Sequence, residues 1–162
     1  GEGRASAVVE MTGSSFKAMT HDTKLNLLVL FYSPEDCGSL ALEFEAVART
    51  FEPFSNVTIA RIAVQEHPET FDKYSHLGLP AIVFFGQADR YFGFKPKEVV
   101  YADLRLAGPM VRFLNRKCAT REPLHRLPGL SEDDTDALPR EGDADAPDWV
   151  FQPAGAGGAG EL

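Results

Sequence analysis

The stretch Leu25-Asn-Leu-Leu-Val-Leu-Phe-Tyr32 is the longest apolar run in this chain of 162 residues. It has the length of a strand and is too apolar for a strand with one face in water, so it predicts a central strand that is covered on both faces. It is much shorter than the roughly 18 apolar residues that a membrane-spanning helix needs, so we expect no membrane span.

Strand and helix patterns alternate on both sides of this stretch. Before it, residues 7–11 predict a short strand and residues 14–20 a short helix with a serine cap. After it, residues 39–51 carry one helical stripe of apolar side chains, which predicts a helix. Further along, the pattern predicts strands over 57–64, 81–85 and 99–102 and helices over 68–74 and 106–117.

The order of these elements decides the fold class. A strand followed by a helix and another strand implies parallel pairing, and the final pair of strands implies an antiparallel edge. We therefore predict an α/β fold, with a mixed sheet that has helices on both faces.

Three separated segments carry a more specific pattern. Residues 28–34, with sequence Leu-Val-Leu-Phe-Tyr-Ser-Pro, are followed by Cys37; residues 77–85 contain Pro80; and Arg105 precedes the last predicted helix. In this order they resemble the thioredoxin-fold domains of the protein disulfide isomerase family. The first segment is similar to the family's active-site strand and helix start, and the second to its cis-proline segment, with Pro80 as the cis-proline.

The cysteine pattern departs from that family. Active members carry Cys-x-x-Cys, in which the first thiolate attacks and the second thiol resolves the mixed disulfide. Here the loop between Tyr32 and Phe44 is two residues shorter. Aligned backward from Phe44, Cys37 takes the second position and Pro34 the first, or the first is deleted. Aligned forward from Tyr32, Cys37 lies near the first position, and Leu40 takes the second. Neither alignment supplies a second cysteine.

The proton relay implied by the resemblance is also absent. Active members place a buried acid two residues before Tyr32, and this chain has Leu30 there. Glu35 and Asp36 would raise the pKa of a nearby thiol by like-charge repulsion. Arg105, which resembles the family arginine that helps the resolving cysteine to lose its proton, is retained. We therefore expect a degenerate active site and no dithiol exchange.

The remaining candidate sites are few. Cys37 is either a monothiol redox site or a partly buried thiol without a role. A bridge from Cys37 to Cys118 is not expected, because those two helix ends are normally far apart in this fold. Asn56 begins a glycosylation sequon, Asn-Val-Thr. We expect no metal and no cofactor, since no ligand spacing connects the four histidines, which we interpret as surface or capping residues: His21, His67, His76 and His125.

The charges divide the chain into two parts. The net charge is −8, but residues 131–148 alone hold eight acids and one base, so the preceding part is neutral. We predict a thioredoxin-like domain over 1–122, with the resemblance running from about 7 to 121, and an acidic tail rich in proline and glycine over 123–162. The acidic balance argues against nucleic acid and anionic membranes as partners.

The tail contains the only tryptophan, in Asp-Trp-Val-Phe. Since Trp and Phe are common interface anchors, Trp149 and Phe151 are candidates for docking the tail on a protein partner. The chain starts at Gly1 without an initiator Met or a signal-peptide pattern, so we expect a processed chain whose targeting segment has been removed.

Two classes of function follow. In the first, the protein is a redox-inactive interaction module, an accessory or structural subunit of a larger assembly. In the second, it is a chaperone-like or monothiol member of the protein disulfide isomerase family that binds clients at Pro80. The resemblance implies the endoplasmic reticulum or another organelle lumen of the secretory pathway, with a plastid or mitochondrion as the alternative.

Overall fold

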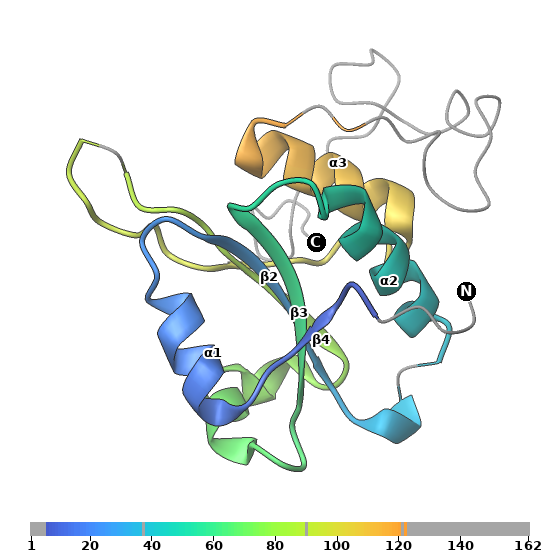
Figure 1. Cartoon of the computed structure of the whole chain (residues 1–162). Helices are drawn as coiled ribbons and strands as arrows, with labels where there is room; N and C mark the ends of the chain where they lie inside the picture. The colour runs from blue at the N-terminus through green and yellow to red at the C-terminus, as the bar shows by residue number, and fades with distance from the viewer. Residues whose placement is uncertain (1–5, 37, 90, 121, 123–162) are drawn as a thin grey trace, which may run out of the picture.

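The computed structural model describes residues 6–36, 38–89, 91–120 and 122. A five-stranded mixed sheet has helices on both faces, with α2 and α3 on one and α1 and η2 on the other (Figure 1). The predicted fold class is therefore confirmed. In chain order the elements are β1 Val9–Glu10, α1 Gly13–Thr20, β2 Asn26–Tyr32, η1 Pro34–Asp36, α2 Leu40–Phe51, β3 Val57–Ala63, η2 Pro68–Leu77, β4 Ala81–Phe85, β5 Val99–Val100 and α3 Ala107–Cys118.

Strand β2 lies at the centre of the sheet, whose strand order is β1-β3-β2-β4-β5. It pairs parallel with β3 and antiparallel with β4, and β5 adds the predicted antiparallel edge. Its side chains alternate between two apolar cores. Leu28 and Leu30 pack with α2 and α3, and Leu27, Val29 and Phe31 pack with α1 and η2. This confirms the prediction of a central strand that is covered on both faces.

One carboxylate joins the two helices that cover the first face. Helix α3 begins after Leu106, whose side chain cannot cap it, and the backbone N–H of Ala107 donates to Glu43 Oε1 at 2.7 Å. Glu43 lies in the first turn of α2. Its negative charge therefore lies at the N-terminal ends of both helices, where the helix dipoles favour it.

Replacing Glu43 by alanine is expected to lower the free energy of unfolding by about 1 kcal/mol, the usual effect of losing an N-terminal cap. Urea unfolding followed by circular dichroism measures the change. Glu43→Gln keeps an acceptor oxygen without the charge and should lose about half as much. Equal losses in the two variants would contradict the hydrogen bond to Ala107.

Some boundaries differ from the predictions. The cap of α1 is Thr12, not a serine at the start of the predicted helix, because the Thr12 hydroxyl accepts from the Ser15 N–H at 3.2 Å and the Ser15 hydroxyl accepts from the Thr12 N–H at 2.8 Å. The edge strands β1 and β5 pair over only two residues each.

Segment η2 is a 3₁₀ helix that extends to Leu77, three residues beyond the prediction. The hydroxyl of Thr70 donates to the carbonyl of His67 at 2.7 Å, and that of Ser75 to the carbonyl of Asp72 at 3.3 Å. Each hydroxyl donates to the carbonyl three residues earlier in the chain. Such bonds favour the 3₁₀ form over the α-helix, in which each backbone N–H donates to the carbonyl four residues earlier.

Candidate functional site

The candidate site lies where β2 ends and the chain turns into η1 and α2. The peptide bond between Leu79 and Pro80 is cis, as the resemblance implied. Because Phe31 pairs with Ala81, Pro80 lies level with Tyr32 at the end of β2. The fold therefore brings Pro80 to the same edge of the sheet as the loop that contains Pro34.

A polar cluster fills the start of this loop. The hydroxyl of Ser33 is buried and donates to Glu35 Oε1 at 2.5 Å. The side-chain amide of Gln65, from the turn after β3, donates to Ser33 Oγ at 3.3 Å and to Glu35 Oε1 at 3.4 Å. Pro34, the first residue of η1, is exposed.

These contacts favour the charged form of Glu35. The hydrogen bond from Ser33 lowers the pKa of the Glu35 carboxyl, with smaller contributions from its own backbone N–H and from Gln65 that outweigh a small effect of burial. A carboxylate in this loop disfavours a thiolate near it. A site that activates a cysteine has positive charge near the thiol, whereas Glu35 gives this loop a negative charge.

Replacing Ser33 by alanine is expected to raise the pKa of Glu35 toward 4.5, the ordinary value for glutamate. A group whose folded-state pKa lies below its unfolded value stabilises the fold above the unfolded pKa and loses that effect as the pH falls through the folded pKa. An NMR titration of the Glu35 side chain measures the pKa of its carboxyl in the wild type and in Ser33→Ala. A midpoint that Ser33→Ala leaves unchanged would contradict the assignment to Ser33.

Leu30 occupies the position where the resemblance implies a buried acid. Its side chain is 1% exposed. It packs in the core cluster that includes Phe44 and Val47 of α2 and Ile82 of β4. The space below the loop is therefore filled by hydrocarbon at this position, and Leu30 itself can neither accept nor relay a proton.

Arg105 lies two residues before α3, and the residue as a whole is largely exposed, although neighbouring atoms partly cover its guanidinium. Partial burial lowers the pKa of its guanidinium, while the nearby Tyr101 hydroxyl opposes that shift. Burial raises the pKa of Tyr101, and its hydroxyl donates to the carbonyl of Leu104. The bond from Ala107 to Glu43 brings this segment beside the first turn of α2. Arg105 lies two residues from this contact between the start of α3 and α2, and its predicted role in aiding a resolving cysteine stays a prediction.

Several predicted residues lie outside the described part of the chain. These are Cys37 and the tail with Trp149 and Phe151. Asn56 is described, exposed, and immediately precedes β3. Cys118 is a half-buried free thiol at the end of α3, and burial raises its pKa to about 12. Such a thiol stays protonated and unreactive at neutral pH.

Two histidines act at helix ends, in line with the capping interpretation. His67 precedes η2, and its Nδ1 accepts from the N–H of Gly13 at 3.3 Å. His21 is the C-terminal cap of α1, with its ring at 2.8 Å from the carbonyl of Lys17. Among the described residues, no group of three His, Cys, Asp or Glu could hold a metal ion.

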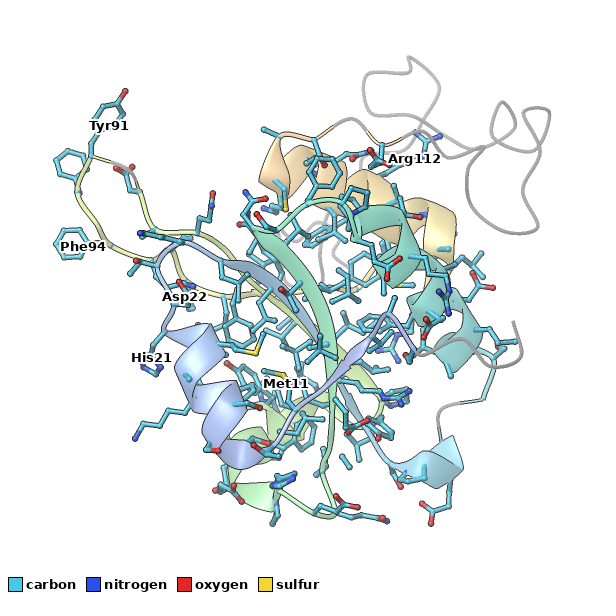
Figure 2. The ribbon with its side chains drawn as sticks, in the orientation of Figure 1. Met11, His21, Asp22, Tyr91, Phe94 and Arg112 are labelled. Carbon is cyan, nitrogen blue, oxygen red and sulfur yellow. The ribbon has the colours of Figure 1, made fainter. Side chains whose placement is uncertain are left out.

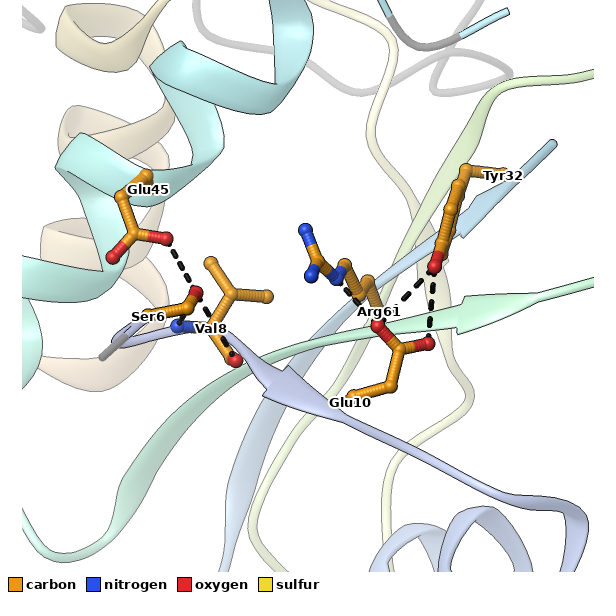
Figure 3. A network of polar contacts seen from close by, with 6 residues as sticks. All are labelled: Ser6, Val8, Glu10, Tyr32, Glu45 and Arg61. Atoms are coloured by element: carbon orange, nitrogen blue, oxygen red, sulfur yellow. Dashed lines mark hydrogen bonds and ion pairs between the residues drawn. The ribbon is translucent and has the colours of Figure 1, made fainter. Parts of the chain in front are cut away.

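A charged network beside the loop was not found by sequence reasoning. Glu10 of β1 accepts from the Tyr32 hydroxyl at 3.1 and 3.2 Å and forms an ion pair with Arg61 of β3 at 2.6 Å (Figure 3). The Arg61 guanidinium also lies 5.7 Å from the centre of the Tyr32 ring. The only sequence signal is that three polar residues fall on three strands, which become neighbours only in the folded sheet. The contacts hold Tyr32, the last residue of β2, in place.

The same view shows how the start of the described chain is attached. Glu45 of α2 accepts a hydrogen bond from the hydroxyl of Ser6 at 2.6 Å (Figure 3). It also accepts one from the backbone N–H of Ala7 at 2.6 Å. Burial alone would raise the pKa of Glu45, but these two bonds and the nearby Arg49 lower it. The carboxylate therefore ties the segment before β1 to α2.

Comparisons with known proteins agree with this geometry. The thioredoxin family model matches residues 7–105, and the chain belongs to that family. Among curated proteins it is 32% identical to protein disulfide isomerase-like 2-1 of Oryza sativa subsp. japonica over 117 residues, which is 71% of this chain and 30% of that protein. It is also 32% identical to a probable protein disulfide-isomerase A6 of Medicago sativa, with the same coverage.

Solved structures show the same fold. The Trx4 domain of ERdj5 matches with a TM-score of 0.59 and 24% identity, over 72% of this chain and all of that domain. Chloroplastic thioredoxin z matches with a TM-score of 0.55 and 18% identity, over 69% of this chain and 95% of that structure. The chain is thus a thioredoxin domain with relatives of the disulfide isomerase type, and it spans about a third of the length of those curated relatives.

Proposed function

We propose that this protein is a redox-inactive thioredoxin-like interaction module and that it serves as an accessory or structural subunit of a larger protein assembly. The observation that carries the proposal is Leu30, which fills the position of the relay acid with a buried hydrocarbon side chain. Disulfide exchange needs a thiolate to attack and a second thiol that can lose its proton to resolve the mixed disulfide.

Two further features support the proposal. The Glu35 carboxylate, held charged by Ser33, opposes a thiolate in the loop. The second cysteine of the chain, Cys118, lies at the far end of α3 with a raised pKa. No helix in the described part of the chain is long and apolar enough to cross a membrane.

The proposal is tested by insulin reduction with dithiothreitol, using the full chain beside an active thioredoxin. We expect no acceleration above the rate with dithiothreitol alone, and the same result for Cys37→Ser. The matched control is Cys118→Ser, which should also change nothing. Turnover that Cys37→Ser abolishes and Cys118→Ser retains would overturn redox inactivity.

A second candidate function rests on the position of Pro80, level with Tyr32 at the end of β2. The half-buried Pro80 lies beside the loop, so this edge could hold an extended peptide. In that case the protein is a chaperone-like or monothiol member of the disulfide isomerase family. Its proposed location is then the endoplasmic reticulum lumen, with a plastid or mitochondrion as the alternative for either function.

Native mass and crosslinking in an extract of the source distinguish the two. A large particle with fixed companions, crosslinked through the tail at Trp149 and Phe151, is expected for a subunit. Small particles with changing clients, or a mixed disulfide at Cys37, would support the second candidate instead.

A further inference from the structure

The connection between β4 and β5 exposes three aromatic side chains to water. Tyr91 is 82% exposed, Phe92 74% and Phe94 75%. We call these three residues the aromatic finger. Figure 2 shows Tyr91 and Phe94 at the end of a loop that projects away from the body of the domain, and Figure 1 shows that loop on the opposite side from η1. A cluster of exposed aromatic rings of this size marks an interaction surface.

The finger is an ordered structure. Asp89 Oδ1 accepts from the N–H groups of Tyr91 at 2.7 Å and Phe92 at 3.0 Å. The backbone closes the loop through Gly93 N–H to the Asp89 carbonyl at 2.7 Å and Asp89 N–H to the Phe94 carbonyl at 2.9 Å. Gly93 has a φ of 77°, which favours glycine. Because these bonds hold the rings before any partner arrives, binding costs less conformational entropy.

The base of the finger is tied to the turn between α1 and β2. Gln87 N–H donates to the buried Asn26 Oδ1 at 2.8 Å, and Ala88 N–H donates to the carbonyl of Thr23 at 2.9 Å. The Lys95 ammonium donates to the carbonyl of Asp22 at 2.8 Å. These anchors fix both sides of the loop at the base of the finger.

An apolar groove begins at this base. It runs between α1 and η2, has a volume of about 640 Å³, and is lined by the rings of Phe16, Tyr74 and Phe85. Lys95 and Pro96, which follow the finger directly, line it as well. The molecule thus presents a projecting aromatic element and an aromatic-lined groove next to each other.

We propose that two copies of this chain associate by placing the aromatic finger of each in the groove of the other. Because finger and groove are adjacent, a two-fold axis near Lys95 and Pro96 allows both insertions at once, as a closed symmetric dimer requires. The inference goes beyond the proposed function and does not depend on the redox state of Cys37.

The area is sufficient for a stable dimer. Each ring presents about 200 Å² when fully exposed. With roughly three quarters of each ring free, two fingers bury about 900 Å². The walls of two grooves add only about 400 Å². The total of about 1,300 Å² lies at the lower end of the range of stable protein interfaces, which suits a dimer that dissociates on dilution.

The charges at the rim do not favour a charged occupant. Lys17 and Lys73 line the groove together with Glu69 and Asp72, so the rim has no single sign. The three uncharged rings of the finger are not repelled by a rim of mixed charge. The acidic segment 131–148, with eight acids and one base, is repelled by half of it and attracted by the other half.

Sedimentation velocity of the full chain, from about 1 to about 100 µM, tests the proposal. We expect a dimer that dissociates on dilution. Replacing both Phe92 and Phe94 by alanine should raise the dissociation constant about 100-fold or more, as loss of central aromatic anchors does. The control is Leu42→Ala on α2, where a side chain 75% exposed lies outside both the finger and the groove; it should leave the dimer unchanged. Circular dichroism checks that each variant folds.

A complementation experiment tests the reciprocal geometry. Thr20 lines the groove, and Thr20→Trp should fill it and yield a monomer. Mixing this variant with the Phe92 and Phe94 double variant should restore a weaker heterodimer, since one intact finger then meets one intact groove. A monomeric wild type at about 100 µM, or a dimer that the double variant retains, would overturn the proposal. So would a monomeric wild type that binds anionic phosphatidylserine vesicles through Phe92 and Phe94.

Discussion

Replacing Leu30 by aspartate is expected to lower the free energy of unfolding by about 4–6 kcal/mol at neutral pH, close to the whole stability of many domains of this size. Part of the loss is the cavity left by a leucine that is 1% exposed. The rest is the cost of holding a carboxylate among apolar side chains. The expectation follows directly from the hydrocarbon environment of Leu30.

The loss should depend on pH in a definite direction. Burial raises the pKa of the new aspartate in the folded state above its unfolded value of about 3.9. Below that value both states hold the proton, so only the cavity remains. As the pH rises from the unfolded pKa to the folded-state pKa, the unfolded state is charged while the folded state still holds its proton, so stability falls until both states are charged.

Urea unfolding at about pH 4 and about pH 8 measures this difference for Leu30→Asp. The matched control is Leu30→Ala, which should lose about 3 kcal/mol with little difference between the two pH values. If Leu30→Asp does not fold at the higher pH, the free energies of unfolding of Leu30→Asp and Leu30→Ala can still be compared at the lower pH. If the free energy of unfolding changed with pH by the same amount in the two variants, the apolar environment of this position would be contradicted.

The second large effect is expected for Phe31→Ala. Phe31 has no exposed surface, and its ring lies 5.3 Å from the rings of Phe71 and Tyr74 and 5.7 Å from that of Phe16. Removing it leaves a cavity at the meeting point of β2, η2 and α1, and should cost about 4 kcal/mol. Equilibrium unfolding in urea measures the change.

A graded control is available on the other face of the sheet. Phe54 is half-buried and packs only at the edge, 5.9 Å from the ring of Phe51. The same substitution there should cost about 1–2 kcal/mol. Equal losses at Phe31 and Phe54 would show that the aromatic cluster around Phe31 does not contribute as its burial implies.

The sequence predicted those elements whose pattern is local. The apolar run of β2 and the stripe of α2 depend on one periodicity each, and both were confirmed within a residue or two. Segment η2 was predicted as an ordinary short helix, because the hydroxyl bonds of Thr70 and Ser75 that favour the 3₁₀ form do not change hydropathy.

The site was predictable only where a family pattern carried it. Pro80 was placed correctly in this way, whereas the contact of Gln65 with Ser33 depends on a turn 32 residues away that only the folded sheet brings near. The aromatic finger was missed for another reason. Tyr91-Phe-Gly-Phe94 looks like core material by hydropathy, and its exposure follows from the Gly93 turn and the Asp89 bonds that close the loop.

The carboxylate of Glu43 has a consequence for motion. Its bond to Ala107 crosses from one helix to the next, so the Ala107 amide hydrogen can exchange with solvent only when the two helices separate. The exchange rate of that one amide therefore reports how often α2 and α3 separate. A partner that binds across these two helices would slow the exchange, even if it touches neither Glu43 nor Ala107.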